Sequence, residues 1–397
     1  MAEKKNQHYV PQMYLRNFAS GSKKAIHLYN IPSKRKVSDA PIKGQCAQSY
    51  FYGKDLKIED AFRVLEGGAS RIIRGILDAG TVPKPRSKEA GDLLVFTIFQ
   101  YARTKDMADK HDDMAEKFIK AVIEHDGSID KEVLDKVTIK LTKPVGLALD
   151  SAAKGFHMAV DLKVKVLINH TAVEFITSDN PVVLYNQMFE QSNPALGSNT
   201  GLTSKGLQIF LPLSPTHLLV MYDGGAYKIG EKRSDSAFIT NPNDIRQLND
   251  LQYLNSLENL YSYSEFSDAE LFTLERRNAG RQRNRKGLLH QHEQLDRHDG
   301  TSSVLLHLSK PDHRIGLSVQ PIRQLARLTE AELNAFPKPL RNPRLVAIHK
   351  EFMEEVKAKK YNVSEMRRFA EDRMKAIFSE QNVFAPLARP PEGFRQV

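Results

Sequence analysis

The sequence contains a single cysteine, Cys46, among 397 residues, and it contains no tryptophan. One thiol cannot form an intramolecular disulfide framework or a cysteine-rich zinc site, and this scarcity fits a reducing compartment. The polar N-terminal residues lead into no apolar h-region, which argues against a secretory signal. The longest apolar run, 93–99, is far shorter than the roughly 20 residues that span a bilayer. We therefore expect a cytoplasmic protein without a membrane partner.

Common enzyme signatures are also missing. The sequence has no Gly-x-x-x-x-Gly-Lys-Ser/Thr phosphate loop, no Gly-x-Ser-x-Gly elbow, no His-Glu-x-x-His helix and no Gly-x-Gly-x-x-Gly fingerprint. These absences argue against nucleotide hydrolases, serine hydrolases, zincins and dinucleotide enzymes. They do not bear on metal-dependent nucleases, whose carboxylates are scattered along the chain.

The charge of the chain is spread unevenly. The formal net charge is +10, and residues 266–397 hold 24 Lys and Arg against 17 Asp and Glu. This surplus indicates a polyanionic partner, most often nucleic acid. The length of the chain and the change in composition near residue 266 predict two parts, a domain over 1–265 and a basic extension over 266–397. The candidate nucleic-acid-binding residues of the extension are Arg276, Arg277, Arg281, Arg283, Arg285 and Lys286.

The hydrophobic pattern predicts an α+β fold. Residues 58–77 have the apolar spacing of one buried helix stripe, and Ser87 is a suitable N-cap for a second helix that begins near Lys88. Later segments alternate with a period of two, and short connections favour antiparallel pairing. We expect a helical N-terminal half packed on a mostly antiparallel sheet, with a helix-rich C-terminal extension. The expected later elements are strands at 164–168, 173–177, 182–185, 208–211 and 217–222, and helices at 242–260 and 363–378.

Two motifs carry a resemblance to a known family. The string His-Tyr-Val-Pro-Gln-x-Tyr-Leu-Arg-Asn-Phe at 8–18 and the tetrapeptide Ser-Asp-Asn-Pro at 178–181 resemble the bacterial domain of unknown function numbered 4238. The similarity spans roughly the first 265 residues. The family has no assigned biochemical activity, and some members are associated with antiviral defence. The resemblance therefore implies a defence role for this chain as an expectation.

Two glutamates and one arginine are the first candidate site residues. Glu59 and Glu66 are seven positions apart, so on a helix they differ by only about 20° and share one face. They could converge on a metal or a substrate, or they could form a salt-bridge ladder with Arg63, which lies between them. Arg103 follows an apolar helical run. If it is buried it requires a carboxylate partner, which Glu59, Glu66 or Asp179 could supply, and otherwise the helix emerges into solvent there.

His8 and Asp179 complete the candidate set. Asp179 ends a predicted strand, where a carboxylate is well placed to hold a divalent cation, although the following Asn-Pro is also typical of a simple turn. His8 could act as a general base or a ligand, or it could be a hydrogen-bonded packing residue. The histidines between His290 and His313 lack the spacing of a zinc site and indicate a polar loop.

These residues support one leading hypothesis and two alternatives. In the leading hypothesis His8, Glu59, Glu66, Arg103 and Asp179 line one polar cleft that hydrolyses phosphodiesters. Glu59, Glu66 and Asp179 would hold Mg²⁺ or Mn²⁺, Arg103 would stabilise the phosphate charge, and His8 would transfer protons. In the first alternative the protein is a non-enzymatic sensor or binding module, and the same residues form a buried structural network. In the second alternative it is an enzyme that acts on a nucleotide-like small molecule.

Overall fold

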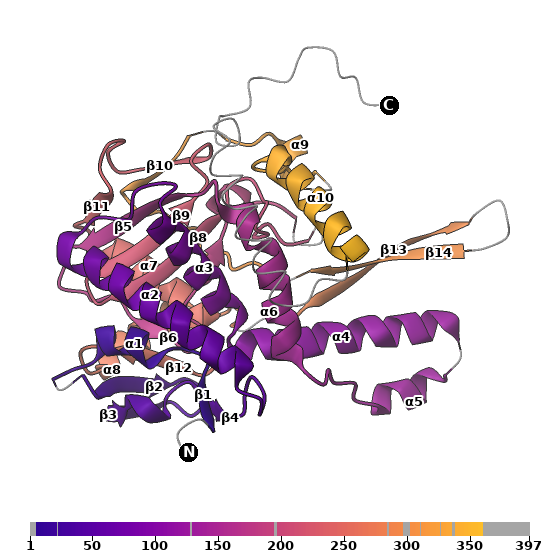
Figure 1. Cartoon of the computed structure of the whole chain (residues 1–397), viewed down its shortest axis with the longest axis horizontal. Coiled ribbons are helices and arrows are strands. Elements are labelled where there is room, and N and C mark those ends of the chain that lie inside the picture. Colours follow the sequence, from indigo (N-terminus) through magenta and orange to yellow (C-terminus); the bar gives the residue numbers. More distant parts are fainter. Residues whose placement is uncertain are drawn as a thin grey trace, which may run out of the picture.

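The computed structural model describes residues 5–21, 23–127, 129–193, 197–283, 286–296, 302–309, 311–325, 327–335 and 338–359. The chain is a mixed α and β structure with mostly antiparallel sheets, as predicted (Figure 1). The helices are α1 (Gln12–Leu15), α2 (Lys57–Ala79), α3 (Lys88–Ala102), α4 (Lys105–Asp126), α5 (Lys131–Lys136), α6 (Pro144–Gly155), α7 (Pro242–Asn255), α8 (Asp268–Arg277), α9 (Glu330–Leu333) and α10 (Pro343–Lys359).

Two larger sheets organise the strands. The five-stranded sheet has the order β11-β5-β9-β8-β7, in which only the β11–β5 pair is parallel, and the four-stranded sheet has the order β3-β2-β12-β6. The strands are β1 (Asn6–His8), β2 (Ala25–Asn30), β3 (Arg35–Pro41), β4 (Ala47–Ser49), β5 (Lys163–Asn169), β6 (Thr177–Ser178), β7 (Val183–Tyr185), β8 (Gln208–Ser214), β9 (His217–Tyr222), β10 (Tyr227–Ile229), β11 (Ser236–Ile239), β12 (Asn259–Ser262), β13 (Leu288–Asp296), β14 (Ser302–Ser309) and β15 (Ile322–Gln324).

Local signals placed the long helices correctly. The Oγ of Ser87 accepts a hydrogen bond from the backbone N–H of Ala90 at 3.1 Å and begins α3 as predicted. Thr104 then caps α4 in the same way, with its Oγ1 3.3 Å from the backbone nitrogen of Met107. Arg103 is the C-cap of α3, so it occupies the corner between these two helices.

Two predicted elements differ from the structure. Residues 173–176 do not pair with β5, whose neighbours are β9 and β11. The side-chain amide of Asn169 instead donates to the carbonyl oxygen of Val173 at 2.6 Å, and this contact closes a loop. The predicted helix 242–260 ends at Asn255, because the chain turns there and residues 259–262 form β12. The first difference comes from a contact within the loop itself, and the second from the pairing of β12 with the distant strand β2.

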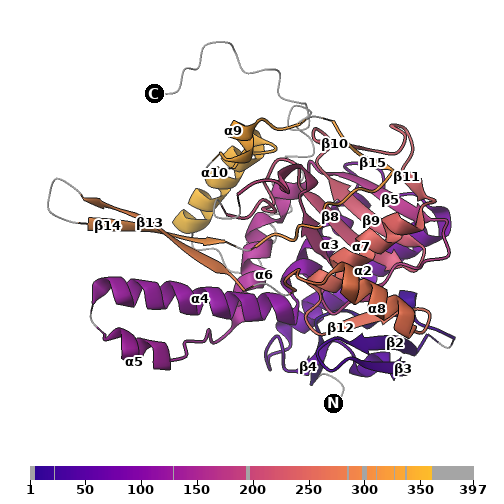
Figure 2. The same cartoon turned by 180° about the vertical axis from the view of Figure 1, so that it is seen from behind.

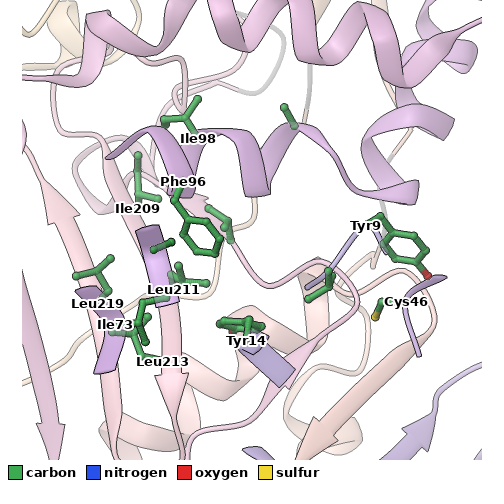
Figure 3. Packing of buried hydrophobic residues seen from close by; sticks show 14 of the residues in the cluster. Tyr9, Tyr14, Cys46, Ile73, Phe96, Ile98, Ile209, Leu211, Leu213 and Leu219 are labelled. Atoms are coloured by element: carbon green, nitrogen blue, oxygen red, sulfur yellow. The ribbon is translucent and has the colours of Figure 1, made fainter. Parts of the chain in front are cut away.

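The main hydrophobic core lies between the N-terminal helices and the five-stranded sheet. Figure 3 shows Phe96 of α3 beside Ile209 and Leu211 of β8, with Ile73 of α2 nearby. Tyr14 is fully buried in the same cluster, and its hydroxyl donates to the carbonyl oxygen of Pro212 at 2.6 Å. The segment around α1 is therefore an integral part of the core.

Part of the predicted extension packs on this body. Strand β15 pairs with β10, and Leu317, Val319 and Ile322 belong to the second hydrophobic cluster. The histidine-containing region that we expected to be a polar loop forms the hairpin β13–β14. Figures 1 and 2 show this hairpin and α4–α5 projecting from the same side of the body. The predicted helix 363–378 lies outside the described residues.

Candidate functional site

Arg103 is the centre of a buried polar cluster. Its side chain is 1% exposed, and its Nη1 lies 2.8 Å from Oε1 of Glu66, whose side chain is 27% exposed. Its Nε donates to Oε1 of Gln100 at 2.8 Å, and its guanidinium carbon lies 4.5 Å from the centre of the Phe62 ring. The remaining nitrogen, Nη2, meets no acceptor in good hydrogen-bond geometry among the described residues, although the Tyr52 hydroxyl interacts with the guanidinium. The expectation that a buried Arg103 needs a carboxylate partner is thus met by Glu66.

Gln100 connects this arginine to the N-terminal motif. Its side chain is 1% exposed, and its Nε2 donates to the backbone carbonyl oxygen of Tyr9 at 3.0 Å. One turn of α3 therefore holds both Arg103 and the strand that contains His8. Sequence reasoning missed Gln100, although its spacing of three from Arg103 on a helix was the available signal.

His8 lies on β1, which pairs with β4 so that His8 faces Ala47. Its Nε2 is 3.1 Å from the carbonyl oxygen of Lys43 and 3.3 Å from Nε2 of Gln12, and in the tautomer that donates to Lys43 the acceptor is Nδ1. Burial lowers the pKa of His8, and the positive charge of Arg103 lowers it further, while the Lys43 carbonyl and Glu66 act in the opposite direction. The imidazole is therefore neutral at pH 7.

Glu59 lies two turns before Glu66 on the same side of α2. Burial and the negative charge of Glu66 raise the pKa of Glu59, and Arg103 and Arg63 partly offset this rise. The alternative of a salt-bridge ladder from Glu59 through Arg63 to Glu66 is wrong. Arg63 pairs with Asp60 at 2.9 Å, and Glu66 pairs with Arg103. We call His8, Glu59, Glu66, Gln100 and Arg103 the Arg103 cluster.

The carboxylate of Asp179 is bound by backbone nitrogens and not by a residue of the Arg103 cluster among the described residues. Its two carboxylate oxygens accept hydrogen bonds from the backbone nitrogens of Leu257, Glu258 and Asn259 at 2.8–2.9 Å. Burial raises the pKa of Asp179 to about 6, although these backbone bonds act against the rise. The carboxylate therefore fixes the distant turn between α7 and β12, whereas the turn interpretation had Asp179 bind the backbone of its own Ser-Asp-Asn-Pro segment.

Among the described residues, no three His, Cys, Asp or Glu side chains are grouped so that they could hold a metal ion. Asp179 is bound by backbone nitrogens and Glu66 by Arg103, and a ligand set of Glu59, Glu66 and Asp179 stays a prediction. Binding of Mg²⁺ or Mn²⁺ stays a prediction, and no chemical step below depends on it.

A family model for the Protein of unknown function (DUF4238) matches residues 6–266. The chain belongs to this family. Neither the curated proteins nor the solved structures contain a match to the chain. All five residues of the Arg103 cluster and the Ser-Asp-Asn-Pro turn lie inside the DUF4238 match. Within the described residues, no helix has the length and apolar character needed to cross a membrane.

A second buried polar network surrounds the Ser-Asp-Asn-Pro turn at residues 178–181. The Nδ2 of Asn180 donates to Oδ2 of Asp106 at 2.7 Å, and Lys110 donates to the same oxygen at 2.5 Å. The side-chain amide of Asn255 donates to the carbonyl oxygen of Asn180 at 2.6 Å. Asp106 and Lys110 are 1% and 9% exposed, and sequence reasoning missed them. Their i, i+4 spacing directly after the cap residue Thr104 was the available signal.

The basic segment 276–286 lies outside the family match, and several of its arginines bind groups of the protein itself. Arg277 pairs with Asp250 at 2.7 Å, and Arg281 donates to the carbonyl oxygen of Ile315 at 3.1 Å. Arg283 donates to the carbonyl oxygen of Tyr253 at 3.1 Å and stacks on that ring. Arg276 and Lys286 are exposed, and Arg285 lies outside the described residues. Among the five predicted residues that the structure describes, three form internal bonds and two are exposed.

Proposed function

We propose that the protein hydrolyses phosphodiesters at the Arg103 cluster and serves in bacterial antiviral defence. The observation that carries this proposal is the guanidinium of Arg103. It is held on two of its nitrogens by Glu66 and Gln100 and interacts with the Tyr52 hydroxyl, while Nη2 meets no acceptor in good hydrogen-bond geometry among the described residues. A rigid, buried cation with an available donor can stabilise the charge on a phosphate oxygen in the transition state.

The two neighbouring groups supply proton transfer. His8 is neutral, and its Nδ1 can accept a proton from the attacking oxygen. Burial and the charge of Glu66 raise the pKa of Glu59, and we assign to Glu59 the role of the acid that donates to the leaving oxygen. Glu66 and Gln100 hold Arg103 and act as positioning residues. A base, an acid and a cation in one place are the parts that this reaction needs.

Replacing His8 by Gln should lower the rate of phosphodiester cleavage by roughly 100-fold or more, because a positioned general base contributes about 10²–10⁴-fold. The Gln side chain can still donate to the Lys43 carbonyl oxygen, so the fold should be unaffected. The measurement is cleavage of a fluorescent single-stranded oligonucleotide by the full chain. His125→Gln, on an exposed residue of α4, is the matched control. A wild-type chain without cleavage, or a His8→Gln variant with full activity, would refute the proposal.

A second candidate is a non-enzymatic sensor or binding module. It is favoured by the continuous path of bonds from Glu66 through Arg103 and Gln100 to the backbone of Tyr9, because such a path can serve stability alone. In that case the Arg103 cluster stabilises the N-terminal motif, and binding occurs elsewhere on the protein. Absence of cleavage together with retention of a partner would support this candidate.

For nucleic acid as the partner, we propose contacts through the exposed Arg276 and Lys286. Changing both to Ala should weaken retention on a single-stranded DNA or RNA column and lower the slope of log affinity against log salt by about 1–2, because each phosphate contact releases a counterion. Arg283→Ala is not a suitable probe, since it also removes internal bonds. The exposed pair Arg35→Ala, on β3, and Lys24→Ala, in the turn before β2, is the control. Equal retention of both double variants would contradict this proposal.

A further inference from the structure

The C-terminal helix α10 is attached to the body by a small set of contacts. Leu345 and Phe352 are 1% and 4% exposed, and Leu345 packs against Val160. Before the helix begins, Arg341 forms an ion pair with Asp161 at 2.8 Å. Facing α10 on the body is η4 (Phe156–Ala159), the short 3₁₀ helix that directly follows α6.

Two histidines meet in this interface. Nδ1 of His349 on α10 lies 3.3 Å from Nε2 of His157 on η4, and their ring centres are 5.1 Å apart. The ring of Phe352 lies 5.4 Å from that of His157, and Phe156 lies on another side at 6.0 Å. His157 is only 7% exposed. The two histidines are therefore in direct contact in a largely aromatic environment.

A contact of this kind tolerates only one proton between the two nitrogens. One ring must donate an N–H and the other must accept it, so at least one of the two imidazoles must be neutral. If both rings become protonated, two donors and two positive charges face each other at 3.3 Å in a poorly solvated place. We infer that α10 is a releasable helix, and that proton uptake by the His157–His349 pair releases it from the body.

Charged groups around the pair do not offset this repulsion. Within the described residues, neither ring forms an ion pair with a carboxylate. On the adjoining elements, Asp150 of α6 pairs with Lys154, Asp92 of α3 pairs with Lys88, and Asp161 pairs with Arg341. On α10 itself, Lys350 and Glu351 are exposed.

The direction of the pH dependence follows from these surroundings. Burial, followed by the charge of His349, lowers the pKa of His157 to about 4, and burial also lowers the pKa of His349. Both values lie below the ordinary 6.5, so docking of α10 is fully stabilised above about pH 6.5. It is lost progressively as the pH falls from 6.5 towards 4.

Hydrogen exchange of the full chain, read for separate segments, tests this inference. Between pH 7 and pH 5, protection of residues 343–359 should fall on the order of tenfold or more relative to the intrinsic exchange rates. Protection of β8 and β9 should be unchanged. In His157→Gln, whose amide nitrogen can take the place of Nε2, the fall should be less than about threefold.

His349→Asn is the second variant, for the case in which His157→Gln does not fold. Its side-chain oxygen can accept the proton of a charged His157, so α10 should again stay docked at pH 5 better than in the wild-type chain. Loss of protection in the wild type that both variants repair would support the inference. An equal loss in the wild type and in the folded variants, or full protection of the wild type at pH 5, would overturn it.

Discussion

Replacing Arg103 by Met should lower the free energy of unfolding by about 3–5 kcal/mol, which is the usual cost of removing one partner of a buried ion pair. The guanidinium is 1% exposed and bonds to both Glu66 and Gln100, so its removal leaves two polar side chains without their donor. The contact with the Phe62 ring is lost as well. Because Glu66 is 27% exposed and can partly rehydrate, we expect a value near the lower end of this range.

The matched control is Arg63→Met on α2. Arg63 is 64% exposed and pairs with Asp60 at 2.9 Å, so its removal should cost less than about 1 kcal/mol. Urea unfolding of both variants and of the wild-type chain gives the comparison. Phosphodiester cleavage by Arg103→Met should also be lost. A cost below about 1 kcal/mol for Arg103→Met would show that the Arg103 cluster does not have the buried character described above.

Local sequence signals predicted the elements that position this site. The apolar stripe of α2 and the cap residue Ser87 at the start of α3 gave the helices and their order along the chain. The requirement that a buried Arg103 find a carboxylate named Glu66 as one of three candidates, and the structure selects it. The helices follow from periodicity within short segments, whereas the ion pair follows from the cost of burying a charge, which named three possible carboxylates without choosing among them.

Contacts between distant residues could not be predicted in this way. Asp179 could be a metal ligand or a turn residue on sequence alone, and the three backbone nitrogens that it accepts from lie 78–80 positions away. Arg277 and Arg283 look like surface charges in a basic run, yet Asp250 and the carbonyl of Tyr253 bind them. In each case the partner becomes adjacent only after α7 has packed.

Glu59→Gln tests the central claim most directly, because it separates catalysis from stability. Burial and the negative charge of Glu66 disfavour the ionised form of Glu59, so a neutral amide at this position should leave the free energy of unfolding unchanged or slightly increased. As the general acid, however, it should be needed for protonation of the leaving oxygen, and the cleavage rate should fall by roughly 10²–10⁴-fold. Asp78→Asn, at an exposed position of α2, is the control. The account predicts a Glu59→Gln variant that is as stable as the wild type but inactive, and a variant that retains cleavage within about twofold would contradict it.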